Sequence, residues 1–188
     1  MPVPTGLRLA WAAAPEPDAR RAVAFGLLAD LAPGARFVQR CPLCGGPHGP
    51  VRVAGAKLHA SVTYAGGLAI VAAVPAGSAP LITAIGIDAE AEADPQRDAV
   101  GLRGILGEGP ATLRGWTRVE AALKADGRGL RVEPSTVSVI EDGDGWRAGI
   151  PDAAPVRGWD LDGPAGVVLS GAVRLQAAPA AASGPPSR

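Results

Sequence analysis

The apolar positions near the start of the chain follow a helical spacing. Val23, Leu27 and Leu31 recur at every fourth residue within residues 16–31, as on one face of an amphipathic helix. A Pro-Gly pair follows at residues 33 and 34, and both residue types commonly end helices. The pattern therefore predicts a helix over residues 16–31.

The spacing then changes to short apolar runs rich in β-branched residues. Such runs cover residues 58–64, 68–74 and 81–87, and turns bearing Gly or Pro separate them. Runs of this length between turn residues are typical of strands. A shorter run at residues 35–40 is a further strand candidate. Since the three long runs follow one another closely, we expect them to form a meander.

A second helix-then-strand series follows. Residues 98–106 and 111–125 read as helices, the second ending at a Gly. Four strand candidates come after them: residues 136–142, 146–150, 156–161 and 165–175. The order predicts an α+β fold of two similar halves, each a helix plus an antiparallel sheet, over residues 1–92 and 93–176. Residues 177–188 are rich in Ala, Pro and Ser, which predicts a disordered tail.

Composition narrows the classes of function. The 188 residues are 47% hydrophobic and carry 18 basic and 18 acidic side chains, so the chain suits a folded domain without general attraction to nucleic acid or anionic membranes. Neither a signal peptide nor an apolar run of membrane-spanning length is recognisable. Two cysteines cannot build a disulfide framework. We therefore expect a soluble cytoplasmic protein without nucleic-acid or membrane partners.

Two carboxylates follow the apolar run at residues 81–87. Asp88 and Glu90 are two residues apart, so in extended structure their side chains point to the same side. Mg²⁺ commonly takes one or two carboxylates and completes its shell with water and phosphate. The pair is therefore either a magnesium site or an acidic loop after a strand, and this segment alone leaves both interpretations open.

Glu120 and Lys124 pose a similar choice. They lie four residues apart in the predicted helix, so they are either a surface ion pair, worth about 0.2–0.5 kcal/mol, or two parts of one site. Lys57 is the only other lysine in the chain. The spacing alone does not decide between a pair and a site.

Taken together, the two segments resemble a known signature. Gly-Ile-Asp-Ala-Glu at residues 86–90, followed by Trp-Thr-Arg-Val-Glu-Ala-Ala-Leu-Lys at 116–124, is similar to the paired motifs of the 4'-phosphopantetheinyl transferases, of the two-half type that acts in secondary metabolism. The segments at 41–49, 59–74 and 156–173 also resemble actinobacterial-type members. The resemblance covers roughly residues 16–176.

The resemblance implies a fold and an activity. It implies a pseudo-twofold α+β architecture with the active site in the cleft between the halves, and a monomer, because both sides of the cleft belong to one chain. The implied reaction moves the 4'-phosphopantetheine arm of coenzyme A to a serine of an acyl or peptidyl carrier protein and releases 3',5'-ADP. The implied cofactor is Mg²⁺, with Mn²⁺ as a substitute.

The resemblance also implies residue roles. Asp88, Glu90 and Glu120 would ligate the metal. Glu120 would be the base toward the serine hydroxyl, directly or through a metal-bound water, and Lys124 would contact a phosphate. The candidate contacts to coenzyme A are the hydroxyl-bearing and basic residues Ser61, Tyr64, Arg20, Arg21, Arg52 and Lys124.

The chain departs from the family pattern at three positions. Tyr64 stands where many members have a histidine, and a phenol can donate a hydrogen bond to phosphate but carries no positive charge. Pro50 displaces the expected basic residue to Arg52, and Val119 replaces a frequent lysine. The rival function is a non-catalytic binding module, either a zinc-stabilised interaction domain or a decayed homologue that binds coenzyme A or a carrier protein without transfer. A pure binding module has no need of three carboxylates together.

A second metal site is an open alternative. Cys41, Cys44, His48 and His59 are four residues of the types that bind zinc. A single Cys-x-x-Cys without a second such pair is weak evidence, and His59 falls within a predicted strand. The other interpretation is a turn with buried thiols.

Overall fold

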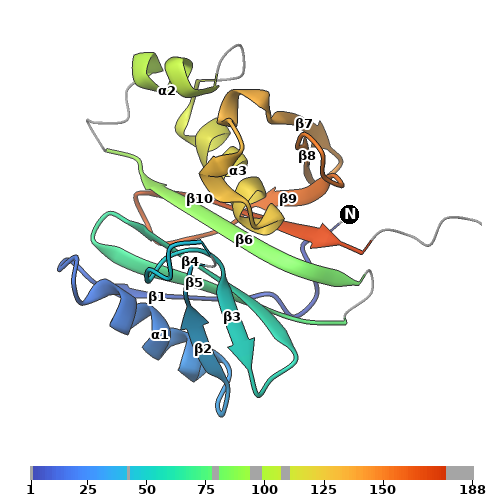
Figure 1. The fold of residues 1–188 in the computed structure, drawn as a ribbon. Coiled ribbons are helices and arrows are strands. Elements are labelled where there is room, and N and C mark those ends of the chain that lie inside the picture. The colour runs from blue at the N-terminus through green and yellow to red at the C-terminus, as the bar shows by residue number, and fades with distance from the viewer. Residues whose placement is uncertain (1, 42, 78–80, 94–98, 107–110, 177–188) are drawn as a thin grey trace, which may run out of the picture.

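The protein is a mixed α/β structure with three antiparallel sheets (Figure 1). The computed structural model describes residues 2–41, 43–77, 81–93, 99–106 and 111–176. The α-helices are α1 (Arg20–Leu31), α2 (Ala99–Leu106) and α3 (Leu113–Asp126). The first six strands are β1 (Arg8–Ala13), β2 (Arg36–Gln39), β3 (Val51–Ala54), β4 (Leu58–Ala65), β5 (Leu68–Pro75) and β6 (Ile82–Ala91). The last four are β7 (Ser138–Asp142), β8 (Gly145–Gly149), β9 (Val156–Asp160) and β10 (Val167–Leu175).

Most of the predicted elements are confirmed. The predicted helices correspond to α1, α2 and α3, although α1 begins four residues later than expected, and the expected strand runs correspond to β2 and β4–β10. The short strands β1 and β3 were not predicted. The proposed tail at residues 177–188 lies outside the described residues, and the pseudo-twofold relation between residues 1–92 and 93–176 stays a prediction.

The predicted meander of β4, β5 and β6 is wrong. β4 and β5 do pair, and β1 completes their sheet in the order β1-β5-β4, but β6 leaves it. β6 pairs antiparallel with β10, from Val167 opposite Ala91 to Leu175 opposite Ile82, at the edge of the sheet β6-β10-β9-β8-β7. Most residues of β6 are buried, as expected for a strand that lies between the lower sheet and α3.

The main elements form four layers, visible from bottom to top in Figure 1. Below, α1 packs Ala24 and Leu28 against the β1-β5-β4 sheet. Between the two larger sheets lies a second core that includes Ile70 of β5 and Ile87 of β6. Above, α3 covers the outer face of β6 and β10 and buries Leu123 among the upper strands. None of the helices in the described ranges has the length and apolar character needed to cross a membrane.

α3 begins and ends at residues suited to those positions. The Thr112 side chain accepts a hydrogen bond from Gly115 N at 3.0 Å, which caps the first turn. At the other end, Gly127 has a φ of 88°, in the left-handed region where glycine is favoured. The residues at its two ends therefore favour these limits of α3 independently of its packing against the sheet.

The contact between α3 and β6 depends on Gly86. A Cβ atom at this position would lie 2.5 Å from the backbone nitrogen of Ala125 and 2.7 Å from Lys124 Cβ, and closer still to the carbonyl oxygen of Ala121. Helix backbone cannot yield as a flexible side chain would. Only glycine lets the helix rest directly on the strand.

A polar network holds the outer side of α3. Arg118 donates to both carboxylate oxygens of Asp160 in β9, at 2.9 and 2.8 Å, and to Glu141 in β7 at 2.6 Å. Burial by itself would raise the pKa of Asp160, but the hydrogen bonds and charge of Arg118 outweigh it and leave that pKa below its usual value. Asp160 therefore stays ionised and fixes the rotation of the helix.

Replacing Gly86 by alanine is expected to destabilise the protein by about 1–3 kcal/mol, because the new methyl group pushes α3 off the strand. The matched control is Gly26→Ala on the exposed face of α1, where a Cβ meets nothing within 4 Å. That variant should be neutral or more stable, since alanine favours helix. Denaturant unfolding of both proteins measures the difference. Equal stabilities would show that the close contact does not constrain the fold.

Candidate functional site

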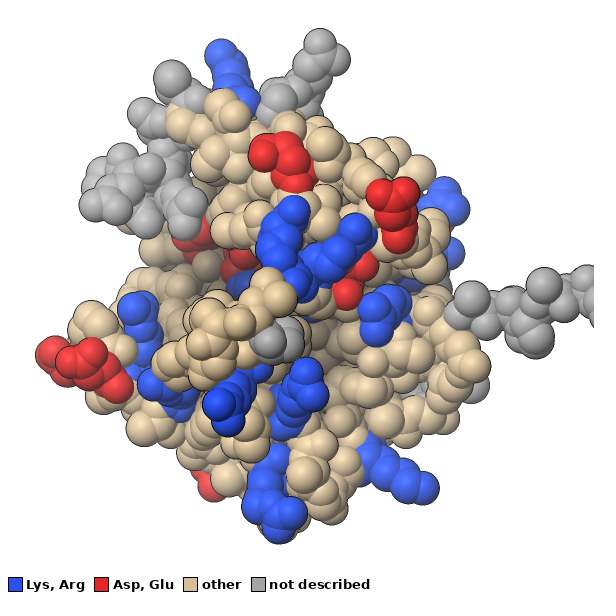
Figure 2. Space-filling model, viewed as in Figure 1, with Lys and Arg blue, Asp and Glu red and all other residues tan. Residues whose placement is uncertain are grey.

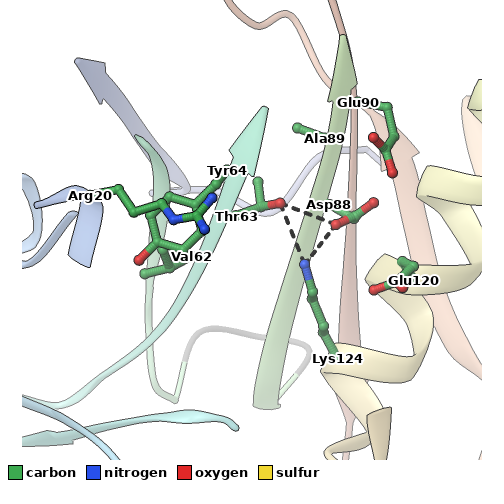
Figure 3. Close-up of a pocket in the computed structure, with 9 residues that line it drawn as sticks. All are labelled: Arg20, Val62, Thr63, Tyr64, Asp88, Ala89, Glu90, Glu120 and Lys124. Atoms are coloured by element: carbon green, nitrogen blue, oxygen red, sulfur yellow. Dashed lines mark hydrogen bonds and ion pairs between the residues drawn. The ribbon is translucent and has the colours of Figure 1, made fainter. Parts of the chain in front are cut away.

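A pocket of about 430 Å³ opens where α1, β4, β6 and α3 meet. α1 contributes Arg20, while β6 and α3 each contribute acidic side chains that face the pocket (Figure 3). The lining residues are Arg20, Val62, Thr63, Tyr64, Asp88, Ala89, Glu90, Glu120 and Lys124. Three carboxylates and two cations therefore share one pocket.

The ion pair of Asp88 and Lys124 forms the centre of this pocket. Lys124 Nζ donates to Asp88 Oδ1 at 2.6 Å and to the carbonyl oxygen of Ile87 at 3.1 Å. Thr63 Oγ1 also donates to Asp88 Oδ1, at 3.1 Å, from β4. The side chain of Asp88 is 8% exposed and that of Lys124 is 30% exposed. The pair is thus partly withdrawn from water, and the lysine is open to the pocket.

The second oxygen of Asp88 has no hydrogen-bond partner within the described ranges. Asp88 Oδ2 is buried there without such a partner, although buried polar atoms are normally satisfied. Glu90, two residues along β6, is also buried, and its Oε1 accepts from Trp116 Nε1 at 2.8 Å. Such a carboxylate oxygen, beside further carboxylates, suits a hard divalent cation. Asp88, Glu90 and Glu120 line the pocket with oxygens of this type, but the metal-ligand atoms already close together in the described part of the chain are those of Cys41, Cys44 and His48.

Tyr64 and Arg20 form the opposite wall. The Arg20 guanidinium lies 5.1 Å from the centre of the Tyr64 ring, within the range of a cation–π contact. Burial raises the pKa of Tyr64, and the nearby charges of Arg20 and Arg21 only partly offset this effect, so the phenol stays protonated and can donate. Arg20 supplies a positive charge beside the tyrosine that replaces the expected histidine.

The structure brings together six of the sequence-predicted site residues: Arg20, Tyr64, Asp88, Glu90, Glu120 and Lys124. The other three do not line the pocket. Ser61 accepts a hydrogen bond from Ile87 N at 3.0 Å and so ties β4 to β6. Arg21 donates to the carbonyl oxygen of Pro47 at 2.8 Å, and Arg52 is an exposed residue of β3.

Two residues of the site were not among the predicted ones. Thr63 holds Asp88, and Trp116 holds Glu90. A sequence signal exists for both: Thr63 shares a strand face with Ser61 two residues earlier, and Trp116 precedes Glu120 by one helical turn. These spacings do not show that Thr63 would bind Asp88 or that Trp116 would bind Glu90.

The cysteine-rich loop forms a separate cluster between β2 and β3. One ligand atom from each of Cys41, Cys44 and His48 lies within 4.8 Å of the others. Backbone hydrogen bonds from Cys44 and Leu43 lower the pKa of Cys41. His59 is not part of this cluster, because its Nε2 lies 3.1 Å from the carbonyl oxygen of Ile82. Of the four residues considered from the sequence, His59, which was expected to lie in a strand, is therefore outside the cluster.

No protein-family model matches the chain, and no curated protein matches it at a significant level.

Replacing Lys124 by methionine is expected to destabilise the protein by about 1–3 kcal/mol, because the buried Asp88 carboxylate loses its cation. Lys57→Met, at the exposed second lysine, is the matched control and should change stability little. Thermal and urea unfolding in metal-free buffer measure both. If Lys124→Met proved as stable as Lys57→Met, the ion pair would contribute nothing to the fold.

Proposed function

We propose that the protein is a Mg²⁺-dependent 4'-phosphopantetheinyl transferase, which moves the phosphopantetheine arm of coenzyme A to a carrier-protein serine. The observation that supports this most is the pocket in which Asp88, Glu90, Glu120 and Lys124 meet. These are the residues to which the resemblance assigned metal and phosphate contacts. Their convergence from β6 and α3 makes the two sequence motifs parts of one site.

The chemical type of the donors suits a magnesium ion. Asp88 and Glu90 offer oxygens from one strand and Glu120 offers its own from the facing helix, and Asp88 Oδ2 is buried without a hydrogen-bond partner among the described residues. When bound, Mg²⁺ would neutralise charge that develops on the pyrophosphate of coenzyme A. Soft ligands such as thiolate are absent from the lining residues of this pocket, which favours a hard ion.

The cationic side chains suit the phosphates of the substrate. The Lys124 side chain is partly exposed and lines the pocket, so its ammonium group would turn from Asp88 Oδ1 to a phosphate oxygen. Arg20 offers a planar group able to bind phosphate with two hydrogen bonds. The neutral Tyr64 phenol adds a further donor. Lys and Arg side chains outnumber Asp and Glu on the lower half of the view in Figure 2, where α1, β2 and β3 lie, which would add to the attraction of an anionic ligand.

Glu120 is the proposed base. It lies on α3 one turn before Lys124, so both side chains reach the same pocket. The carrier serine oxygen forms a bond to the phosphorus that bears the pantetheine arm, the phosphoanhydride bond breaks, and 3',5'-ADP leaves. The serine proton passes to Glu120, directly or through water. The enzyme therefore needs no nucleophile of its own.

The proposal includes the finer features implied by the family resemblance. Residues 1–92 and 93–176 would be related by a pseudo-twofold axis, with the active site between them. The proposed enzyme would be a monomer in the cytoplasm, and its partner would be an acyl or peptidyl carrier protein. Coenzyme A is a substrate and Mg²⁺ the cofactor.

The test is modification of carrier domains. Incubation with coenzyme A and Mg²⁺ should add the phosphopantetheine mass to at least one carrier type, as measured by intact-protein mass spectrometry. Asp88→Asn and Glu120→Gln should each lower the rate by at least about 100-fold, since each removes a group used in the reaction. Glu92→Gln, at an exposed carboxylate just beyond β6, is the matched control and should keep the rate.

Two results would count against the proposal. Absence of any mass shift across acyl and peptidyl carrier domains, with coenzyme A still bound, would favour the non-catalytic binding module. Wild-type rates in Asp88→Asn or Glu120→Gln would mean that transfer occurs elsewhere. Circular dichroism of each variant separates a lost reaction from a lost fold.

A further inference from the structure

The loop between β2 and β3 brings two thiols and an imidazole together. Cys44 Sγ and His48 Nε2 are 3.0 Å apart, and both ligand atoms lie within 4.8 Å of Cys41 Sγ. Ligand atoms around a tetrahedral zinc ion, at bonds of about 2.0–2.3 Å, lie about 3.3–3.8 Å from one another. The spacing in the loop therefore needs only small side-chain movements to accept the ion.

The backbone of the loop is arranged to support this cluster. Two backbone hydrogen bonds close the turn, from Gly45 N to the Cys41 carbonyl oxygen at 2.9 Å and from Cys41 N to the Gly46 carbonyl oxygen at 2.8 Å. Gly46 N also points to Cys44 Sγ at 3.4 Å. The turn therefore holds the Cys44 sulfur beside its own backbone.

Gly46 keeps the space beside two of the ligands. A Cβ atom there would lie 3.2 Å from Cys44 Sγ and 3.1–3.3 Å from the His48 ring. Its φ is not in the left-handed region, so backbone conformation does not explain the glycine. The glycine is instead explained by the space that the Cys44 sulfur and the His48 ring need.

We infer that Cys41, Cys44 and His48 bind one Zn²⁺ ion, a site separate from the carboxylate pocket. Two thiolates and an imidazole are soft and intermediate ligands, which favour zinc over Mg²⁺. The cluster has three ligand side chains within the described part of the chain, and it lies near the surface. A water molecule would occupy the fourth position of a tetrahedral site.

The site would fix the loop against α1. Arg21 of α1 donates to the carbonyl oxygen of Pro47, which lies inside the loop between Cys44 and His48. Arg20, the neighbouring residue, lines the carboxylate pocket. Zinc therefore orders a loop that contacts the helix carrying one wall of that pocket. The inference does not depend on the transferase proposal, because metal binding is measured without any reaction.

The experiment titrates the freshly reduced full-length protein with Zn²⁺ in competition with a chromophoric chelator. About one tightly bound Zn²⁺ per chain is expected, and Co²⁺ in its place should give the absorption of tetrahedral thiolate coordination. Cys44→Ser and His48→Gln should each weaken zinc binding at least about tenfold. His59→Gln is the matched control, because it removes the only other histidine, and should bind as the wild type does.

Binding of less than about a tenth of an equivalent by the reduced protein would overturn the inference. So would unchanged binding in both Cys44→Ser and His48→Gln. Because the protein is reduced before titration, a disulfide between Cys41 and Cys44 cannot hide a site that exists. Circular dichroism of the zinc-free variants shows that the fold is retained, so that weak binding is attributable to the lost ligand.

Discussion

The direct contact of α3 with β6 at Gly86 is the constraint on which the site depends. Without a side chain at this position, helix and strand backbones approach closely, and Lys124 then lies at hydrogen-bond distance from Asp88. Arg118, bound to Asp160, sets the rotation of the same helix. The Gly in the first motif thus places the Glu and Lys of the second against the carboxylates of the first.

Within the described residues, the protein itself does not satisfy every carboxylate oxygen of the pocket. Burying a carboxylate costs several kcal/mol unless it is paired, and Asp88 is paired through one oxygen while the other is buried without a hydrogen-bond partner in the part of the chain that the structure describes. A fold that only needed stability would gain from an apolar residue here. A buried carboxylate is reasonable here if a bound cation pairs with its second oxygen. This is the physical argument for the metal-dependent function that we propose.

Much of this arrangement could be predicted from the sequence. Apolar spacing located α1, α3 and most strands, and the two-residue spacing of Asp88 and Glu90 put both carboxylates on one face of β6. The pairing of β6 with β10 could not be predicted, since local patterns do not identify a partner more than 70 residues away. Nor could spacing show that Ser61 bridges β4 to β6, or that Trp116 holds Glu90.

Anomalous diffraction from crystals grown with Mn²⁺ and coenzyme A would test the account most directly, because it locates the ion without relying on an assay. The account predicts a manganese peak bound by Asp88, Glu90 and Glu120, next to the pyrophosphate, with Lys124 moved toward a phosphate oxygen. A structure with coenzyme A bound but no ion on these carboxylates, and Lys124 still paired with Asp88, would contradict it.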